Sequence, residues 1–314
     1  MSETEKTVIC WVLQQSKATD IKLIKSFEDW KTNAHEIAGC FVKPADRAVG
    51  LGFTADKIAF AFLSGFHTAL ESLLPFLKVD QAAAFCISEK EGNHPQQIKT
   101  SISKETQDEK LWRLNGVKTF VTCATKADVL FIAVSAGVDE SGRNKLRLVQ
   151  IDSKSKGVSI ESLKPLGFIP EIDHGCVQLD GVIIDDHQIL PGDGYTKYIK
   201  PFRILEEMHV SAALLGYICR KSFQHKWSTV IRERVISLIV LIQQLLAMDP
   251  ASSSLHIAFA GFQQQMNTLM GDLLPCWEAV GQEQKNEWLR DIQVFSIAET
   301  ARKKRLIKAW SEYN

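Results

Sequence analysis

The pattern of hydrophobic and polar positions divides the chain into three stretches. In residues 5–80 and 197–314, apolar side chains recur at the spacing of one face of an amphipathic helix. Residues 82–190 instead form short segments rich in β-branched and aromatic residues, separated by Gly, Asn, Asp and Pro. We therefore predict an α+β protein with an N-terminal helical domain (1–81), a central antiparallel β-sandwich or barrel domain (82–190) and a C-terminal helical bundle (191–314).

Helix starts and stops refine the two helical stretches. Thr54 is expected to cap a helix whose apolar face runs from Phe60 to Leu74, and Pro75 should break or kink that helix. In the C-terminal stretch, Pro250 is a clear stop. The predicted helical segments there cover residues 204–231, 234–248, 255–280 and 283–310.

The central stretch contains one strong local turn signal. Asn115-Gly116 lies between alternating apolar positions, and both central residues of a type I′ turn need positive φ. The signal predicts a hairpin. The strands expected in the stretch cover residues 83–88, 98–103, 111–113, 119–123, 129–134, 146–151, 158–162 and 175–179.

Composition and charge argue against several classes of function. Lys+Arg and Asp+Glu both number 37, a balance that argues against a general nucleic-acid or anionic-membrane binder. The longest apolar run, residues 235–248, is too short to span a bilayer. Seven cysteines without paired spacing fit a reducing cytoplasm, and we expect a cytoplasmic protein. No motif with metal-ligand spacing occurs, so we expect no metal site.

Three segments, in this order along the chain, resemble the acyl-CoA dehydrogenase flavoproteins. Residues 86–94 lie where that family has a Thr-Glu-Pro-x-x-Gly-Ser-Asp loop. Residues 111–128 resemble its Leu-x-Gly-x-Lys-x-(aromatic)-(Ile/Val)-Thr strand, and residues 175–192 resemble its strand and exit loop. The resemblance covers roughly residues 55–250. It implies the helix, sheet and helical-bundle order with a shortened C-terminus. It also implies FAD as cofactor and α,β-dehydrogenation of an acyl-CoA or carrier-bound acyl thioester, with hydride transfer to FAD.

The resemblance also implies site residues. Those expected at FAD are Phe85, Ile87, Ser88, Phe120, Val121, Thr122, Arg232 and Gln243, and those expected at the substrate are Gly92 and Asn93. Some have simpler explanations. Ser88 and Thr122 are also common as ordinary strand residues, and Arg232 is also explained as a surface residue. His94 and His174 are expected to face solvent.

Glu206 is the candidate catalytic base. In isovaleryl- and long-chain acyl-CoA dehydrogenases, which this part of the chain resembles, the base lies ten residues before the Gly of Ala-x-x-x-Gly. Counting back from Gly216 gives Glu206. The next family residue is normally Arg, and here it is Glu207. The other interpretation is that both carboxylates form a solvated helix start favoured by the macrodipole. The basic segment 302–308 is likewise expected to be a solvated helix face.

The sequence leaves three functions open. The first is the acyl-CoA dehydrogenase-like oxidoreductase. The second is a non-catalytic binding or assembly protein of the same fold that has lost the flavin, and the third is a flavin monooxygenase or oxidase. Residues 235–248 are nearly all apolar and need cover on all sides. Because the family's last helices are missing, we expect a partner subunit to supply it in a homodimer or homotetramer.

Overall fold

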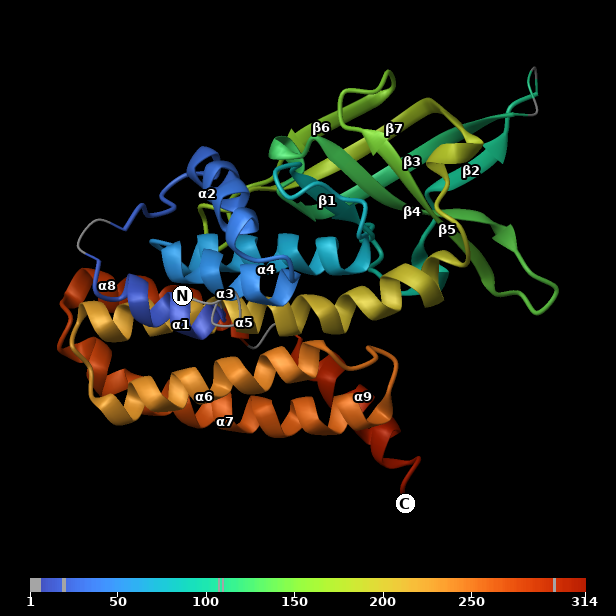
Figure 1. The fold of residues 1–314 in the computed structure, drawn as a ribbon. Coiled ribbons are helices and arrows are strands. Elements are labelled where there is room, and N and C mark those ends of the chain that lie inside the picture. Colours follow the sequence, from blue (N-terminus) through green and yellow to red (C-terminus); the bar gives the residue numbers. More distant parts are fainter. Residues whose placement is uncertain (1–6, 19–20, 107, 109, 296–297) are drawn as a thin grey trace. The chain divides into compact units, whose positions relative to one another are not determined.

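The computed structural model describes residues 7–18, 21–106, 108, 110–295 and 298–314 (Figure 1). The chain divides into two compact units. The β unit contains residues 76–166 and 170–203, and the helical unit contains the residues up to 75, 167–169 and those from 204 onward. This is the α+β architecture that the sequence predicts.

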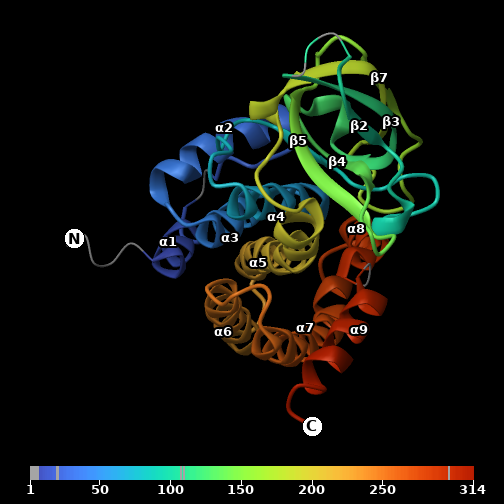
Figure 2. The ribbon, with the colours of Figure 1, turned by 90° about the vertical axis from the view of Figure 1, so that its right-hand side faces the viewer.

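A seven-stranded sheet, curled on itself in Figure 2, builds the β unit. Its strands follow the order β1-β4-β2-β3-β7-β6, with β5 on the other side of β4. They are β1 (Ala83–Cys86), β2 (Ser101–Lys104), β3 (Leu111–Thr122), β4 (Val129–Val138), β5 (Asn144–Asp152), β6 (Val158–Ser162) and β7 (His174–Asp185). One layer of aliphatic side chains, including Leu114, Leu130 and Val177, forms its core.

The sheet is mixed, whereas the sequence predicts an antiparallel one. β1 pairs with β4 in parallel, with Ala83 opposite Val129, and β2 meets β4 in parallel at Ser101 and Ser135. The other pairings are antiparallel. Strand composition does not reveal this difference, because alternating apolar and polar residues suit a strand in either direction.

The predicted hairpin at Asn115-Gly116 is wrong. β3 runs through these residues as one strand, and its register on β7 shifts between Leu114 and Gly116. The Asn115 side chain accepts a hydrogen bond from the Gly181 amide at 2.8 Å. At Gly116 a Cβ atom would lie 2.6 Å from the Cα atom of Thr100, so glycine is needed for close approach and not for a turn.

The helical unit begins with α1 (Val8–Gln15), α2 (Phe27–Cys40), α3 (Pro44–Thr54) and α4 (Ile58–Leu73). α4 ends before Pro75, as predicted, but Thr54 does not cap it. Thr54 is the last residue of α3, and its hydroxyl donates to the Leu51 carbonyl at 3.0 Å. Lys57 occupies the N-cap position of α4 without a side-chain capping bond.

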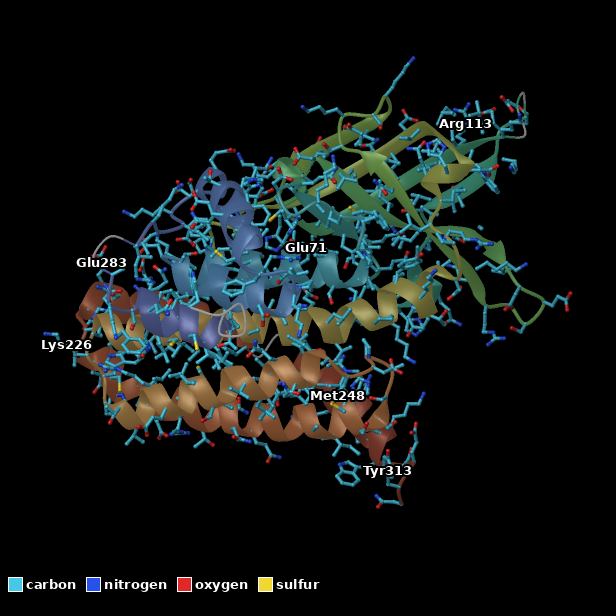
Figure 3. The ribbon with its side chains drawn as sticks, viewed as in Figure 1. Glu71, Arg113, Lys226, Met248, Glu283 and Tyr313 are labelled. Carbon is cyan, nitrogen blue, oxygen red and sulfur yellow. The ribbon has the colours of Figure 1, made fainter. Side chains whose placement is uncertain are left out.

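The C-terminal helices are α5 (Lys200–Gln224), α6 (Thr229–Leu246), α7 (Ser253–Glu278), α8 (Gln282–Asp291) and α9 (Glu299–Trp310). Lys226 has a φ of 52° in the turn after α5 (Figure 3), and Ser228 caps α6. α6 ends before Pro250, as predicted. The single helix predicted over 283–310 is instead divided into α8, a 3-10 turn (Ile292–Phe295) and α9.

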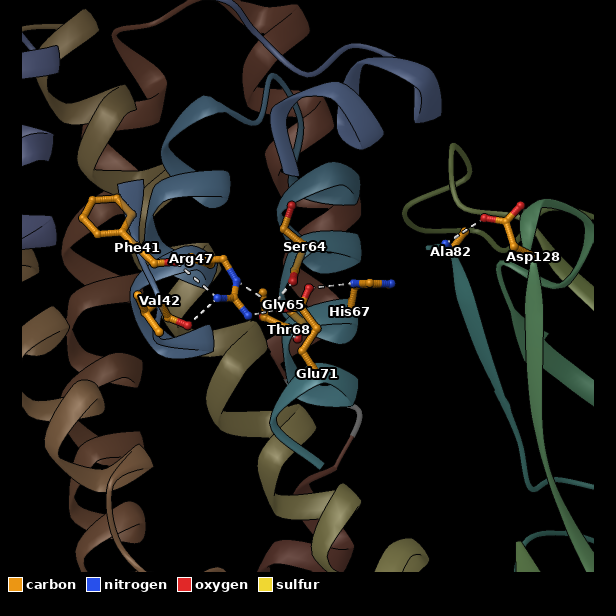
Figure 4. A network of polar contacts seen from close by, with 10 residues as sticks. All are labelled: Phe41, Val42, Arg47, Ser64, Gly65, His67, Thr68, Glu71, Ala82 and Asp128. Atoms are coloured by element: carbon orange, nitrogen blue, oxygen red, sulfur yellow. Dashed lines mark hydrogen bonds and ion pairs between the residues drawn. The ribbon is translucent and has the colours of Figure 1, made fainter. Parts of the chain in front are cut away.

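A buried polar network ties α3 to α4 (Figure 4). The Arg47 guanidinium donates to Glu71 and to the carbonyl oxygens of Phe41 and Val42. The other Glu71 carboxylate oxygen lies 3.1 Å from Nδ1 of His67. These contacts compensate the charges that the core buries.

Candidate functional site

An irregular segment at the end of β3 holds three of the predicted cofactor residues. β3 pairs with β7 up to Lys118 and again from Val121, and its register shifts between these residues. Phe120, inside the shift, has a φ of 53°, and its side chain is 63% exposed. Cys123, directly after the strand, has a φ of 58°. Non-glycine residues rarely adopt this backbone region, and such residues are concentrated at functional sites.

The loop after β1 joins this segment. The Thr119 amide does not bond to β7. It donates to the Ser88 carbonyl at 2.9 Å. This bond brings Ile87 and Ser88 together with the segment 120–122. Phe85, one strand position before Cys86, is buried, and its ring centroid lies 4.5 Å from that of Phe202.

A buried ion pair anchors the same loop. The Lys118 side chain has no exposed surface, and its Nζ donates to Oε1 of Glu89 at 2.7 Å and to the Ile87 carbonyl at 3.3 Å. Glu89 also accepts from the amide and hydroxyl of Thr100 and from the Lys99 amide. Burial alone would raise the pKa of Glu89, but the hydrogen bond and charge of Lys118 and the two amides outweigh it and lower that pKa. Burial lowers the pKa of Lys118, and Glu89 opposes the shift.

The predicted substrate residues Gly92 and Asn93 lie farther along this loop. Gly92 closes a short turn with Glu89, with both amide–carbonyl distances at 2.9 Å, and has a φ of 124°. The Asn93 carbonyl accepts a hydrogen bond from Arg203 at 3.1 Å. Both ends of the turn are thus fixed within the β unit, while the Asn93 side chain is exposed.

His174 belongs to the same site, and the sequence did not point to it. It lies on β7 and is buried, so the expectation that it faces solvent is wrong; His94 is exposed, as expected. Nε2 of His174 is 3.5 Å from the Thr122 hydroxyl, and Nδ1 is 3.2 Å from the Ile172 carbonyl. Burial lowers the pKa of His174, which favours neutral imidazole. A neutral ring whose Nδ1–H donates to the Ile172 carbonyl can accept a hydrogen bond from the Thr122 hydroxyl at Nε2.

The candidate base Glu206 lies in the helical unit, half-buried on α5. Gly216, from which the position of Glu206 was counted, has a role in helix packing. A Cβ atom on Gly216 would lie 2.2 Å from the Val49 carbonyl oxygen, and one on Gly52 would lie 1.8 Å from the Ala213 carbonyl oxygen. The Ala-x-x-x-Gly spacing therefore reflects close contact between α3 and α5.

Glu207 is not part of a solvated helix start. Its side chain is 10% exposed, and its two carboxylate oxygens bind Arg302, at 3.0 Å, and Arg305. Both arginines come from α9, so the expectation that the basic segment is a solvated face is wrong for these two residues. Lys303 and Lys304 on the same helix are exposed, as expected.

Arg232 and Gln243 contact groups of their own helical unit. Nε of Arg232 donates to the Ser222 carbonyl at 3.3 Å, and the guanidinium lies 4.8 Å from the Phe223 ring centroid. The Gln243 amide donates to Asp46. Gln243 also lines a cavity of about 880 Å³ between α1, α3 and α6. The other predicted cofactor residues, from Phe85 to Thr122, all belong to the β unit.

Within the described part of the chain, no three His, Cys, Asp or Glu side chains gather closely enough to hold a metal ion. Among the helices built from those residues, none has the length and apolarity that a membrane crossing needs.

Part of the chain matches a known protein family. Residues 84–182, which contain the strand, the loop and His174, match the middle domain of acyl-CoA dehydrogenase. Comparison of the sequence with curated proteins finds no match.

Solved structures match most or all of the chain. The FAD complex of PigA is 15% identical with a TM-score of 0.72, over 100% of this chain and 99% of PigA. Glutaryl-CoA dehydrogenase from Mycobacterium smegmatis is 13% identical with a TM-score of 0.68, over 99% of this chain and 95% of that one. FkbI, for biosynthesis of a methoxymalonyl extender unit, is 12% identical with a TM-score of 0.63, over 86% and 83%. At these identities the likeness shows the shared fold.

Proposed function

Because the chain is a divergent protein of the acyl-CoA dehydrogenase fold, we propose that it binds FAD and oxidises an acyl thioester. The reaction is α,β-dehydrogenation, with an acyl-CoA or carrier-bound acyl group as substrate. The observation that carries the proposal is the irregular end of β3 joined to the loop after β1. There an exposed aromatic residue with positive φ, a threonine hydroxyl and the Ser88 backbone lie together.

These groups suit the edge of a flavin ring. The backbone at Val121 and Thr122 and the hydroxyls of Ser88 and Thr122 can donate and accept hydrogen bonds. The Phe120 side chain offers an apolar surface beside them. Lys118 and Glu89 keep the loop on the strand, so the groups are positioned before a ligand arrives. When bound, FAD would supply the redox chemistry by accepting the hydride from the β-carbon.

We assign proton removal to Glu206. A carboxylate that takes the α-proton must be ionised and able to reach its substrate. Glu206 is half-buried, and the neighbouring Glu207 is committed to two arginines. Glu206 also holds the family's base position, ten residues before Gly216, which favours it over Glu207. The substrate stays defined only as a thioester. Glutaryl-CoA dehydrogenase, which shares the fold, supports the CoA-bound alternative.

A second candidate is a binding or assembly protein of this fold without flavin. Its support comes from the helical unit. Arg232 and Gln243, which the family resemblance assigns to FAD, contact Ser222 and Asp46 of their own chain. If these contacts persist, the protein offers fewer groups to a cofactor.

The absorption spectrum of the purified protein, before and after addition of FAD, separates the two candidates. We expect bound-flavin bands that persist through gel filtration and that bleach on addition of an acyl-CoA without oxygen. A protein that stays colourless after incubation with FAD refutes the proposal and favours the second candidate. Bound flavin that no acyl-CoA or acyl-carrier thioester bleaches, but that reacts with oxygen in the presence of a donor, favours an oxidase or monooxygenase.

We also propose a homodimer or homotetramer built through the C-terminal helices. On α6, Val240 is 43% exposed, while Val235, Ile239 and Ile242 are buried. Multi-angle light scattering should give a multiple of 35.2 kDa, and Val240→Asp should lower it. Ser159→Asp, at an exposed serine of β6 outside the C-terminal helices, is the control. A stable monomer at micromolar concentration contradicts the proposal.

A further inference from the structure

We infer that Arg302 and Arg305 are positioning residues that hold α5 at Glu207 and thereby aim Glu206. This inference rests on the proposed function. Successive residues of a helix point about 100° apart, so the direction of Glu206 follows from the rotation of its helix. Glu207, the next residue, is held from outside by α9, and holding it sets that rotation.

The contact has the geometry of a clamp. Arg302 binds one oxygen of the Glu207 carboxylate, with Nε 3.0 Å from Oε2, and Arg305 binds the other oxygen. Both oxygens are occupied, so the carboxylate cannot rotate without breaking a charged contact. Charge-assisted hydrogen bonds of this kind are about twice as strong as neutral ones.

Burial makes the clamp stronger than a surface ion pair. The side chains of Glu207, Arg302 and Arg305 are 10%, 17% and 22% exposed. Exposed ion pairs contribute little because water and salt screen them. A carboxylate that is nearly covered must be paired, and removal of its partners leaves a buried charge.

Arg302 is itself anchored at a second place. Its Nη1 lies 3.4 Å from the Gln263 side chain on α7, and its Nη2 lies 3.5 Å from the Phe295 carbonyl in the 3-10 turn before α9. The clamp therefore connects α5 to α7 and α9 at once. In the family, Arg normally follows the base. Here the charge is reversed on α5, and the arginines come from α9.

The test compares Arg302→Gln/Arg305→Gln with Lys304→Gln. The control removes one exposed cation from the same helix. For each variant, we would measure FAD binding by absorbance, single-turnover flavin bleaching by an acyl-CoA, and amide hydrogen exchange over residues 200–210 of the flavin-free protein. We expect bleaching to be roughly ten- to hundredfold slower in the double variant, a size typical of small misplacements of a catalytic group. FAD affinity should stay unchanged, exchange over 200–210 should be faster, and the control should match the parent.

A conservative variant guards against a purely structural effect. Arg302→Lys/Arg305→Lys keeps both charges and should recover part of the bleaching rate. In a Glu207→Gln background the two arginine substitutions should cause less further loss than in the parent, because their partner is already neutral.

Two results would overturn the inference. One is parental bleaching in the double variant while the parent bleaches normally, which leaves the proposed function intact. The other is unchanged exchange over 200–210 in the double variant, which is measured without flavin. A parent that never bleaches refutes the proposed function and with it the role in aiming Glu206. Exchange in the variants then still shows whether the clamp holds α5.

Discussion

Lys118 and Glu89 form a buried ion pair, 2.7 Å from Nζ to Oε1, across the junction of a strand and a loop. Lys118 stands four residues before Thr122, and Glu89 directly follows Ser88. The pair therefore lies next to the two segments that we assign to the flavin. Its position lets it hold these two segments together.

Replacement of one partner of this pair should destabilise the β unit. Lys118→Met leaves Glu89 nearly buried without its cation, and breaking a buried pair typically costs about 3–5 kcal/mol of unfolding free energy. The measurement is urea unfolding followed by circular dichroism. Lys99→Met is the matched control, because Lys99 pairs with Glu91 at an exposed position in the same loop. An unfolding midpoint of Lys118→Met equal to that of Lys99→Met would show that the pair is not needed.

The same pair predicts a pH dependence. The pKa of Glu89 in the folded protein is below its ordinary value of 4.5. A group with a lowered pKa stabilises the fold fully above the unfolded pKa, and loses that contribution as the pH falls through the folded pKa. The unfolding free energy of the parent should thus exceed that of Glu89→Gln at pH 7, and the difference should shrink steadily below about pH 4.5. A difference in unfolding free energy that grows on acidification would contradict the predicted pH dependence.

The crossing of α3 and α5 should not accept a side chain at Gly216. The Cβ atom of Gly216→Ala would meet the Val49 carbonyl oxygen at 2.2 Å, and backbone cannot move aside as a side chain can. We expect a loss of at least about 1–3 kcal/mol, as for overpacked cores. Gly271→Ala on α7 has open space and should gain roughly 0.5–1 kcal/mol from helix propensity. Thermal unfolding compares them; similar melting temperatures would mean that the crossing is looser than described.

Glu206→Gln should abolish most acyl-CoA-dependent flavin bleaching while FAD stays bound. Removal of a general base typically slows a reaction by about 10²–10⁴-fold. Glu207→Gln should slow it less, because in our proposal Glu207 only helps α9 to hold α5 in place and does not take the proton. Stopped-flow bleaching under anaerobic conditions measures both. A larger loss in Glu207→Gln would move the base by one residue, and retained bleaching in both would place it elsewhere.

The sequence predicted the order of helices and strands because that order depends on local patterns. Apolar spacing and Pro250 located the helices, and β-branched segments located most of the strands. Such local patterns do not reveal contacts between residues that are far apart in the sequence. Asn115-Gly116 has the composition of a hairpin turn, yet its role is to bond Gly181 and to let Thr100 approach.

The candidate site was predicted in part for the same reason. Residues close together in the chain, such as 120–122, carry a family pattern that the sequence displays. His174 is 52 positions from Thr122, and Arg302 is 95 positions from Glu207, so neither pairing leaves a local signal. Glu207 stands where the family normally has Arg, and that substitution by itself does not reveal its two arginine partners on α9.

The two units are interleaved along the chain, and this orders their synthesis. The ribosome has released every segment of the β unit soon after residue 203, whereas the helical unit still awaits residues 204–314. Domains generally fold as units while the chain is made. Glu207 emerges 95 residues ahead of Arg302, and during that interval its carboxylate lacks the cations that later cover it. Every strand of the sheet is therefore synthesised before the arginines that pair with Glu207.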